Sequence, residues 1–134
     1  MVPSSRPPRP ATSRSSSDGA DLYLDPEAFH ATFAADVDRA TADVMAATQR
    51  PWNGAAFGAP SGPPAWKAGI PCWYLVGTED KAIPPALQRF MAERANATIV
   101  EVPASHASMV SQPEAATQLV LQAIEATAPA LSGS

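Results

Sequence analysis

The sequence predicts an α/β fold in which parallel strands alternate with helices. Two apolar segments of strand length, residues 70–78 and 97–104, are each followed by a segment with helical spacing, residues 84–96 and 113–128. The order strand, helix, strand, helix is typical of a parallel sheet covered by helices. The chain has 134 residues, of which 46% are hydrophobic, so one modest core is expected.

The first twenty residues differ in composition from the rest of the chain. They are rich in proline, serine and arginine and read MVPSSRPPRPATSRSSSDGA. Such a segment cannot bury enough apolar surface to offset the entropy lost on ordering, so we expect residues 1–20 to form a disordered, low-complexity tail. It lacks the apolar region of a secretory signal and resembles an organelle transit peptide only weakly.

Charge and hydropathy exclude several kinds of partner. The chain has nine basic and thirteen acidic residues, and three of the basic residues lie in the tail, so the remainder is anionic. We therefore expect no nucleic-acid partner. No apolar run approaches the roughly 20 residues of a membrane span, so no membrane partner is expected. The single Cys72 has no second cysteine to pair with, which favours a reducing, cytoplasmic setting with Cys72 in the core.

An amphipathic helix is predicted near the start of residues 21–66. Asp25 can cap a helix whose first position is Pro26, and Phe29 and Phe33 lie on one face of it.

A second helical stretch covers residues 39–50, and the glycines and prolines of residues 52–66 predict a connecting loop. His30, beside the two phenylalanines, is expected to have a surface or packing role.

The later elements have clear boundaries. Residues 70–78, IPCWYLVGT, are apolar without interruption, which suits a strand buried on both faces of a parallel sheet. Two prolines begin the helix over residues 84–96, and Asn96 can end it.

Two residues with useful chemistry follow the two predicted strands. Asp80 comes after the first strand and His106 after the second. Neighbouring parallel strands lie about 4.8 Å apart, so their exit loops can bring a carboxylate within hydrogen-bond reach of an imidazole. A carboxylate that orients the ring of a general base is the second half of a nucleophilic triad. Taken singly, Asp80 could be a polar turn residue and His106 an ordinary loop histidine.

The segments around these two residues resemble a known family. GTEDKAIPP, followed by SHASMVSQPEA, is similar to the C-terminal part of an α/β-hydrolase, in the subgroup of small esterases and hydroxynitrile lyases. The resemblance implies a partial α/β-hydrolase fold: residues 67–134 would form the last parallel core strands with flanking helices, and residues 21–66 part of a helical cap. It implies that Asp80 is the triad acid and His106 the triad base.

The same resemblance implies an esterase-like activity on a small apolar ester-like substrate. The aromatic residues of the cap, Phe29, Phe33 and Trp52, would then line an acyl pocket, although packing between cap and core is an alternative role for them. No cofactor and no metal are expected. The choice among esterase, lactonase, dehalogenase and lyase chemistry stays open.

The nucleophile of this family has no counterpart in the sequence. α/β-Hydrolases carry their serine in a G-x-S-x-G turn between a strand and a helix, and GAPSG, which contains Ser61, places the serine one position off that pattern. We therefore expect a truncated hydrolase that is inactive alone. The alternatives are a non-catalytic small-molecule-binding module, or one half of a two-component hydrolase whose partner chain supplies the missing N-terminal half.

Overall fold

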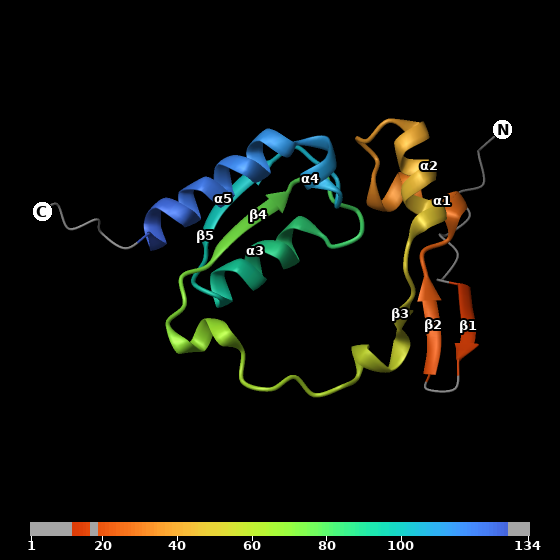
Figure 1. Cartoon of the computed structure of the whole chain (residues 1–134), viewed down its shortest axis with the longest axis horizontal. Helices are drawn as coiled ribbons and strands as arrows, with labels where there is room; N and C mark the ends of the chain where they lie inside the picture. The colour runs from red at the N-terminus through yellow and green to blue at the C-terminus, as the bar shows by residue number, and fades with distance from the viewer. Residues whose placement is uncertain (1–11, 17–18, 129–134) are drawn as a thin grey trace, which may run out of the picture.

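The computed structural model describes residues 12–16 and 19–128, which form two groups of elements (Figure 1). One group holds the early strands and the first two helices, and the other holds a parallel strand pair with its helices. The first group consists of β1 (Thr12–Ser16), β2 (Gly19–Tyr23), α1 (Pro26–Phe33), α2 (Arg39–Thr48), β3 (Trp52–Asn53) and the short 3-10 helix η1 (Gly54–Phe57). After the 3-10 helix η2 (Ala65–Ala68) come β4 (Trp73–Gly77), α3 (Pro85–Arg94), β5 (Thr98–Val102), α4 (Ser108–Ser111) and α5 (Pro113–Thr127).

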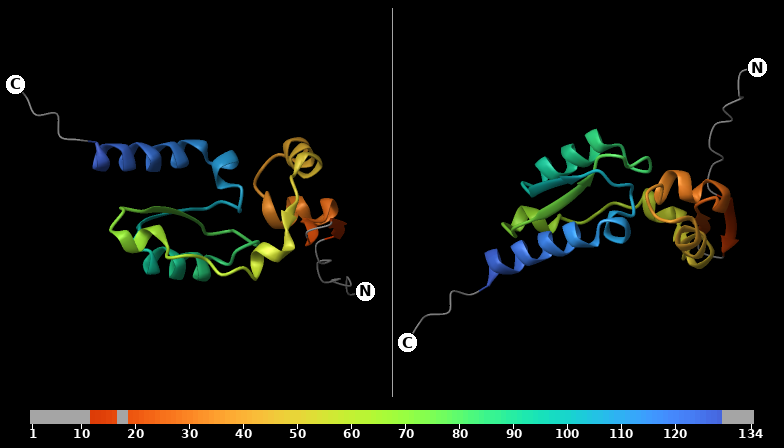
Figure 2. Two further views of the ribbon diagram at one scale, coloured as in Figure 1. Left: turned by 60° about the horizontal axis from the view of Figure 1, so that its bottom comes forward. Right: turned by 90° about the horizontal axis from the view of Figure 1, so that it is seen from above.

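The pair β4 and β5 forms the α/β layer that the sequence predicts. The two strands are parallel and in register from Trp73 opposite Thr98 to Gly77 opposite Val102. Helix α5 lies on one face of this pair and α3 on the other (Figure 2). The alternation of strand and helix is thus confirmed, and both strands end at the same edge of the layer.

Burial along β4 differs from the prediction of a strand covered throughout. Val76 and Gly77 at its carboxyl end are buried, but Trp73, Tyr74 and Leu75 are only half-buried. Within the described residues β4 pairs with β5 alone. The better-covered end is therefore the end that carries the functional loops. Cys72, expected in the core, is half-buried just before the strand.

The helix boundaries follow local signals in the sequence. The Asp25 side chain accepts a hydrogen bond of 3.0 Å from the Glu27 amide and caps α1, whose first residue is Pro26. Beyond α3, Asn96 has a φ of 50°, a left-handed conformation that asparagine tolerates better than most residues. Both predicted boundaries are confirmed. None of the helices in the described ranges is long and apolar enough to cross a membrane.

The structure differs in part from the disordered tail expected for residues 1–20. Residues 1–11 and 17–18 lie outside the described residues, but residues 12–16 and 19–20 belong to the antiparallel strands β1 and β2. Strand β2 also pairs with β3, where Leu22 lies opposite Trp52. A strand ladder is made by backbone groups that nearly every residue possesses, so a polar composition does not exclude it.

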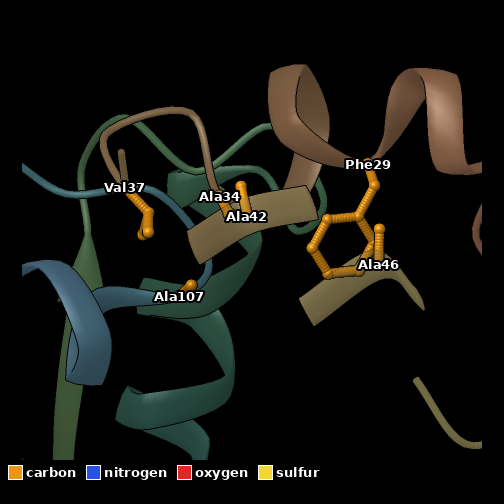
Figure 3. Packing of buried hydrophobic residues seen from close by; sticks show 6 residues of the cluster. All are labelled: Phe29, Ala34, Val37, Ala42, Ala46 and Ala107. Carbon is orange, nitrogen blue, oxygen red and sulfur yellow. The ribbon is translucent and has the colours of Figure 1, made fainter. Parts of the chain in front are cut away.

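The hydrophobic core of the α1–α2 group extends to the loop after β5. Phe29, only 3% exposed, is the largest buried side chain of this cluster, and burial of such a ring contributes roughly 1.5–3 kcal/mol. The cluster consists of Phe29, Ala34, Val37, Ala42, Ala46 and Ala107 (Figure 3). Ala107 follows His106 directly in the chain, so this core fixes the histidine loop against the two helices.

The exits of β4 and β5 are joined by a short seam of backbone contacts. The Thr78 amide donates to the Val102 carbonyl at 2.9 Å, and the Glu79 amide donates to the Ala104 carbonyl at 3.1 Å. Gly77 lies so close to the second exit that an added Cβ would stand 2.8 Å from the Ala104 oxygen. A glycine is needed here because of this close approach.

We expect Gly77→Ala to lower the free energy of unfolding by about 1–3 kcal/mol, because the new methyl group would collide with backbone atoms that cannot move aside. Urea unfolding followed by circular dichroism measures the change. Gly62→Ala is the matched control, since nothing lies within 4 Å of its added Cβ. Equal midpoints for the two variants would contradict the role assigned to Gly77.

Candidate functional site

The turn after β4 is built around the carboxylate of Asp80. The residue is only 6% exposed. Its Oδ1 accepts hydrogen bonds from the amides of Ala82 at 2.7 Å and Ile83 at 2.9 Å. These bonds fold the turn onto the carboxylate just before Pro84 begins the approach to α3.

The turn after β5 brings His106 to the same carboxylate. Nδ1–H of His106 donates to Oδ2 of Asp80 at 2.7 Å, a short distance that is typical of a charge-assisted hydrogen bond. With the proton held on Nδ1, Nε2 of the neutral ring carries a free lone pair. The His106 side chain keeps 30% of its surface exposed, whereas that of Asp80 keeps 3%. The arrangement places a partly accessible imidazole beside a buried carboxylate.

A third polar side chain, Gln88 of α3, completes the surroundings of Asp80. Its Nε2 donates to Oδ2 of Asp80 at 2.9 Å and to the Ile83 carbonyl at 2.8 Å, and its Oε1 accepts from the Gly77 amide at 3.2 Å. The sequence analysis missed Gln88. Gln88 and Ala92 are the buried residues of α3, but a glutamine in a helix gives no sequence signal of burial.

The α1–α2 segment holds the histidine loop from the other side. The Phe33 carbonyl accepts from the Ala107 amide at 3.0 Å and from Oγ of Ser105 at 3.2 Å. Oδ2 of Asp36, in the turn between the two helices, accepts from the Ser105 amide at 3.1 Å. The Phe33 ring lies against the His106 ring, with 4.5 Å between their centroids. His106 is thus positioned by both groups of elements.

Two further groups near the site have displaced pKa values. Burial acts to raise the pKa of Asp36, but the hydrogen bond from the Ser105 amide and the nearby hydroxyl groups of Ser105 and Ser111 outweigh it, so the pKa lies below its ordinary value. Burial raises the pKa of the Tyr74 phenol, and the negative charge of Asp80 raises it further. Tyr74 is therefore a neutral hydrogen-bond donor at neutral pH.

An open cavity of about 430 Å³ adjoins the Asp80–His106 pair. Side chains from β4, the two exit loops, α3, α4 and α5 line it, and most of them are apolar. They are Trp73, Tyr74, Leu75, Gly77, Asp80, Ile83, Gln88, Ser105, His106, Ser108, Met109, Ala116, Leu119 and Val120. His106 therefore borders a largely apolar space of a size that suits a small molecule.

The three cap aromatics named from the sequence lie in different surroundings. Phe33 contacts His106, whereas Phe29 is buried in the α1–α2 core, with its ring centroid 5.1 Å from that of Phe33. Trp52 is 59% exposed and packs on Phe57. None of the three is among the residues that line the cavity, so their expected place in an acyl pocket is not found there.

Other residues considered from the sequence lie away from the pair. His30 Nε2 donates to the Val37 carbonyl at 2.9 Å. This hydrogen bond links α1 to the turn that precedes α2. Ser61 is exposed, and its Oγ donates to the neighbouring Gly62 carbonyl. Among the described residues, no group of three or more His, Cys, Asp or Glu side chains is arranged to hold a metal ion.

Comparison with known proteins gives a family and a fold. The protein-family model described as "Alpha/beta hydrolase family" matches residues 2–118 of this chain. The structure is similar to the crystal structure of polyneuridine aldehyde esterase, with a TM-score of 0.70 and 17% sequence identity over 84% of this chain and 47% of that one.

A histidine-to-alanine mutant of the same esterase gives a TM-score of 0.68 and 17% identity over 83% of this chain and 46% of that one. The chain thus spans about half the length of these solved structures. No curated protein sequence matches this chain.

The contact between Asp36 and Ser105 is expected to weaken in acid. Because the pKa of folded Asp36 lies below its ordinary value of 3.8, its carboxylate stabilises the contact fully above that value, and the contribution is lost as the pH falls through the lowered pKa. Hydrogen exchange of the Ser105 amide between about pH 6 and pH 2 measures this loss of protection.

Asp36→Asn is the control, because its side-chain oxygen can still accept but does not titrate. We expect the acid-induced step to be absent in this variant. The same step in both proteins would assign the effect to other carboxylates.

Proposed function

The chain belongs to the alpha/beta hydrolase family, and we propose that it supplies the acid and the base of a serine-type hydrolase of carboxylic esters. The observation that carries the proposal is the 2.7 Å hydrogen bond between Nδ1 of His106 and Oδ2 of Asp80. It joins the exit loops of two adjacent parallel strands, where α/β proteins commonly bind their ligands.

Each residue of the pair has a defined role in the proposed reaction. His106 takes the hydroxyl proton of a serine through Nε2 while the serine oxygen bonds to the ester carbonyl carbon. The proton then passes to the alcohol oxygen as the carbon–oxygen bond of the ester breaks. Water then attacks the acyl-enzyme. His106 takes a proton from this water and returns it to the serine oxygen as the bond between the serine and the acyl group breaks. Asp80 keeps Nδ1 protonated and stabilises the imidazolium that forms.

The nucleophile must come from outside these 134 residues. The sequence contains no G-x-S-x-G turn. In this family the oxyanion is stabilised by one backbone amide directly after the nucleophile and another from an early strand loop. We propose that the chain is inactive on esters by itself. It would act as a truncated form or as one half of a two-component enzyme whose partner brings the serine.

The substrate class follows from the cavity and from the fold relatives. The space beside His106 is lined mainly by apolar side chains, which suits a small apolar acyl or alcohol group. The esterase named among the similar structures supports an ester substrate. Residues 21–66 would serve as part of the cap beside His106, where the Phe33 ring contacts the imidazole.

A non-catalytic binding module is the second candidate function. The apolar cavity favours it, because that cavity is present in a chain that lacks the nucleophile. An apolar fluorescent probe should then bind at the cavity, and the chain should hydrolyse no ester even when it is mixed with a fragment that carries the nucleophile. That result would favour a binding module over an enzyme.

The enzyme proposal is tested by complementation. Mixed with a fragment that carries a strand, a G-x-S-x-G turn and the oxyanion donors, the chain should hydrolyse a p-nitrophenyl ester that neither part hydrolyses alone. We expect His106→Ala to lower kcat by a factor on the order of a million, and Asp80→Asn by about ten thousand.

His30→Ala is the control for loss of a histidine, because His30 does not line the cavity. Its kcat should stay within a few-fold of the parent value. Hydrolysis that is unchanged by His106→Ala would remove His106 from the mechanism.

A further inference from the structure

Gln88 is a buried amide that the proposed reaction does not use. It is 4% exposed and forms hydrogen bonds to Asp80, to Ile83 and to Gly77. An amide removed from water costs free energy unless its hydrogen bonds are replaced, and all of the bonds of this side chain go to the acid turn and to the strand that leads into it. We propose that Gln88 is a positioning residue that fixes the orientation of the Asp80 carboxylate toward His106. This inference rests on the function proposed for that pair.

The Gly77 amide determines which way the side chain of Gln88 points. It donates to Oε1 at 3.2 Å, so the NH₂ group faces Oδ2 of Asp80 and the Ile83 carbonyl. In the flipped orientation, Oε1 would face two acceptors, and the NH₂ group would face the donor at Gly77. Electrostatic repulsion excludes that arrangement. The backbone of β4 thus orients the donor that acts on Asp80.

The donors around Asp80 are divided between its two oxygens. Oδ1 receives the amides of Ala82 and Ile83, and Oδ2 receives Gln88 and His106. A carboxylate has about four lone-pair positions, so these four donors occupy them all. Rotation of the carboxylate would break bonds on both oxygens. Without Gln88, Oδ2 would be held by the histidine alone, and the histidine is the group that must be positioned.

Gln88 also connects three parts of the site through one side chain. It reaches the end of β4 at Gly77, the carboxylate of Asp80 and the carbonyl of Ile83 at the end of the turn. Helix α3 therefore takes part in the site, although it carries none of the reacting groups. A leucine of similar size would fill the space but would provide neither the donor nor the acceptor.

The test observes the hydrogen bond directly, without ester turnover. In the full chain with ¹⁵N-labelled histidine, the far-downfield proton resonance of His106 Nδ1–H reports its bond to Asp80. Asp80→Asn identifies the resonance by removing or strongly shifting it. We expect Gln88→Leu to broaden the resonance beyond detection at low temperature, because Oδ2 loses its second donor, its bond to His106 loosens and the proton exchanges with water.

Gln118→Leu is the matched control, since it makes the same chemical change at an exposed glutamine of α5. It should leave the resonance unchanged. A resonance of unaltered position and width in a folded Gln88→Leu protein would overturn the proposal. If the parent shows no resonance that depends on Asp80, the pair itself is not formed and the proposed function fails as well.

A second variant covers the case in which Gln88→Leu does not fold. Gln88→Glu keeps the acceptor for the Gly77 amide but places a carboxylate against Asp80. We expect the His106 resonance to be lost at neutral pH and to return when the introduced carboxyl is protonated and can donate. A resonance equal to that of the parent at both pH values would refute the positioning role.

Discussion

The buried carboxylate of Asp80 is the constraint on which the site depends. An ionised carboxylate taken out of water costs several kcal/mol unless hydrogen bonds replace its hydration. Here the amides of Ala82 and Ile83 fix the turn, Gln88 fixes the first helix that follows, and His106 supplies the remaining donor. The turn, α3 and the histidine loop therefore each present a donor to Asp80, and His106 is oriented by the same arrangement.

His106 is held from two directions, so the α1–α2 segment helps to position the candidate site. On the sheet side, the seam between the strand exits keeps the histidine loop beside the acid turn. On the other side, the Phe33 carbonyl and the Asp36 carboxylate hold Ser105 and Ala107, the neighbours of His106 in the chain. A displacement of the helices would thus be transmitted to the imidazole through backbone hydrogen bonds.

The sequence predicted the features that depend on neighbouring residues. The cap at Asp25, the stop at Asn96 and the proximity of Asp80 to His106 follow from local patterns and from parallel strand geometry. The roles of Gln88 and Asp36 depend on contacts across the fold, and a polar residue with a distant partner looks the same in sequence as a surface residue. The β1–β2 pairing was missed because backbone groups make it. The aromatic pattern of α1 left open whether Phe29 lines a pocket or packs in the core, and the structure places it in the core.

The hydrogen bonds around His106 close loops of very different length. The bond to Asp80 spans 26 residues of chain, whereas the bond between Ser105 and Asp36 spans 69. By loop-closure entropy alone, the longer loop costs about 0.9 kcal/mol more to close than the shorter one. During folding, the acid and the base are therefore expected to meet first, inside the unit of β4, α3 and β5. The early helices would dock later, onto an acid–base pair that has already formed.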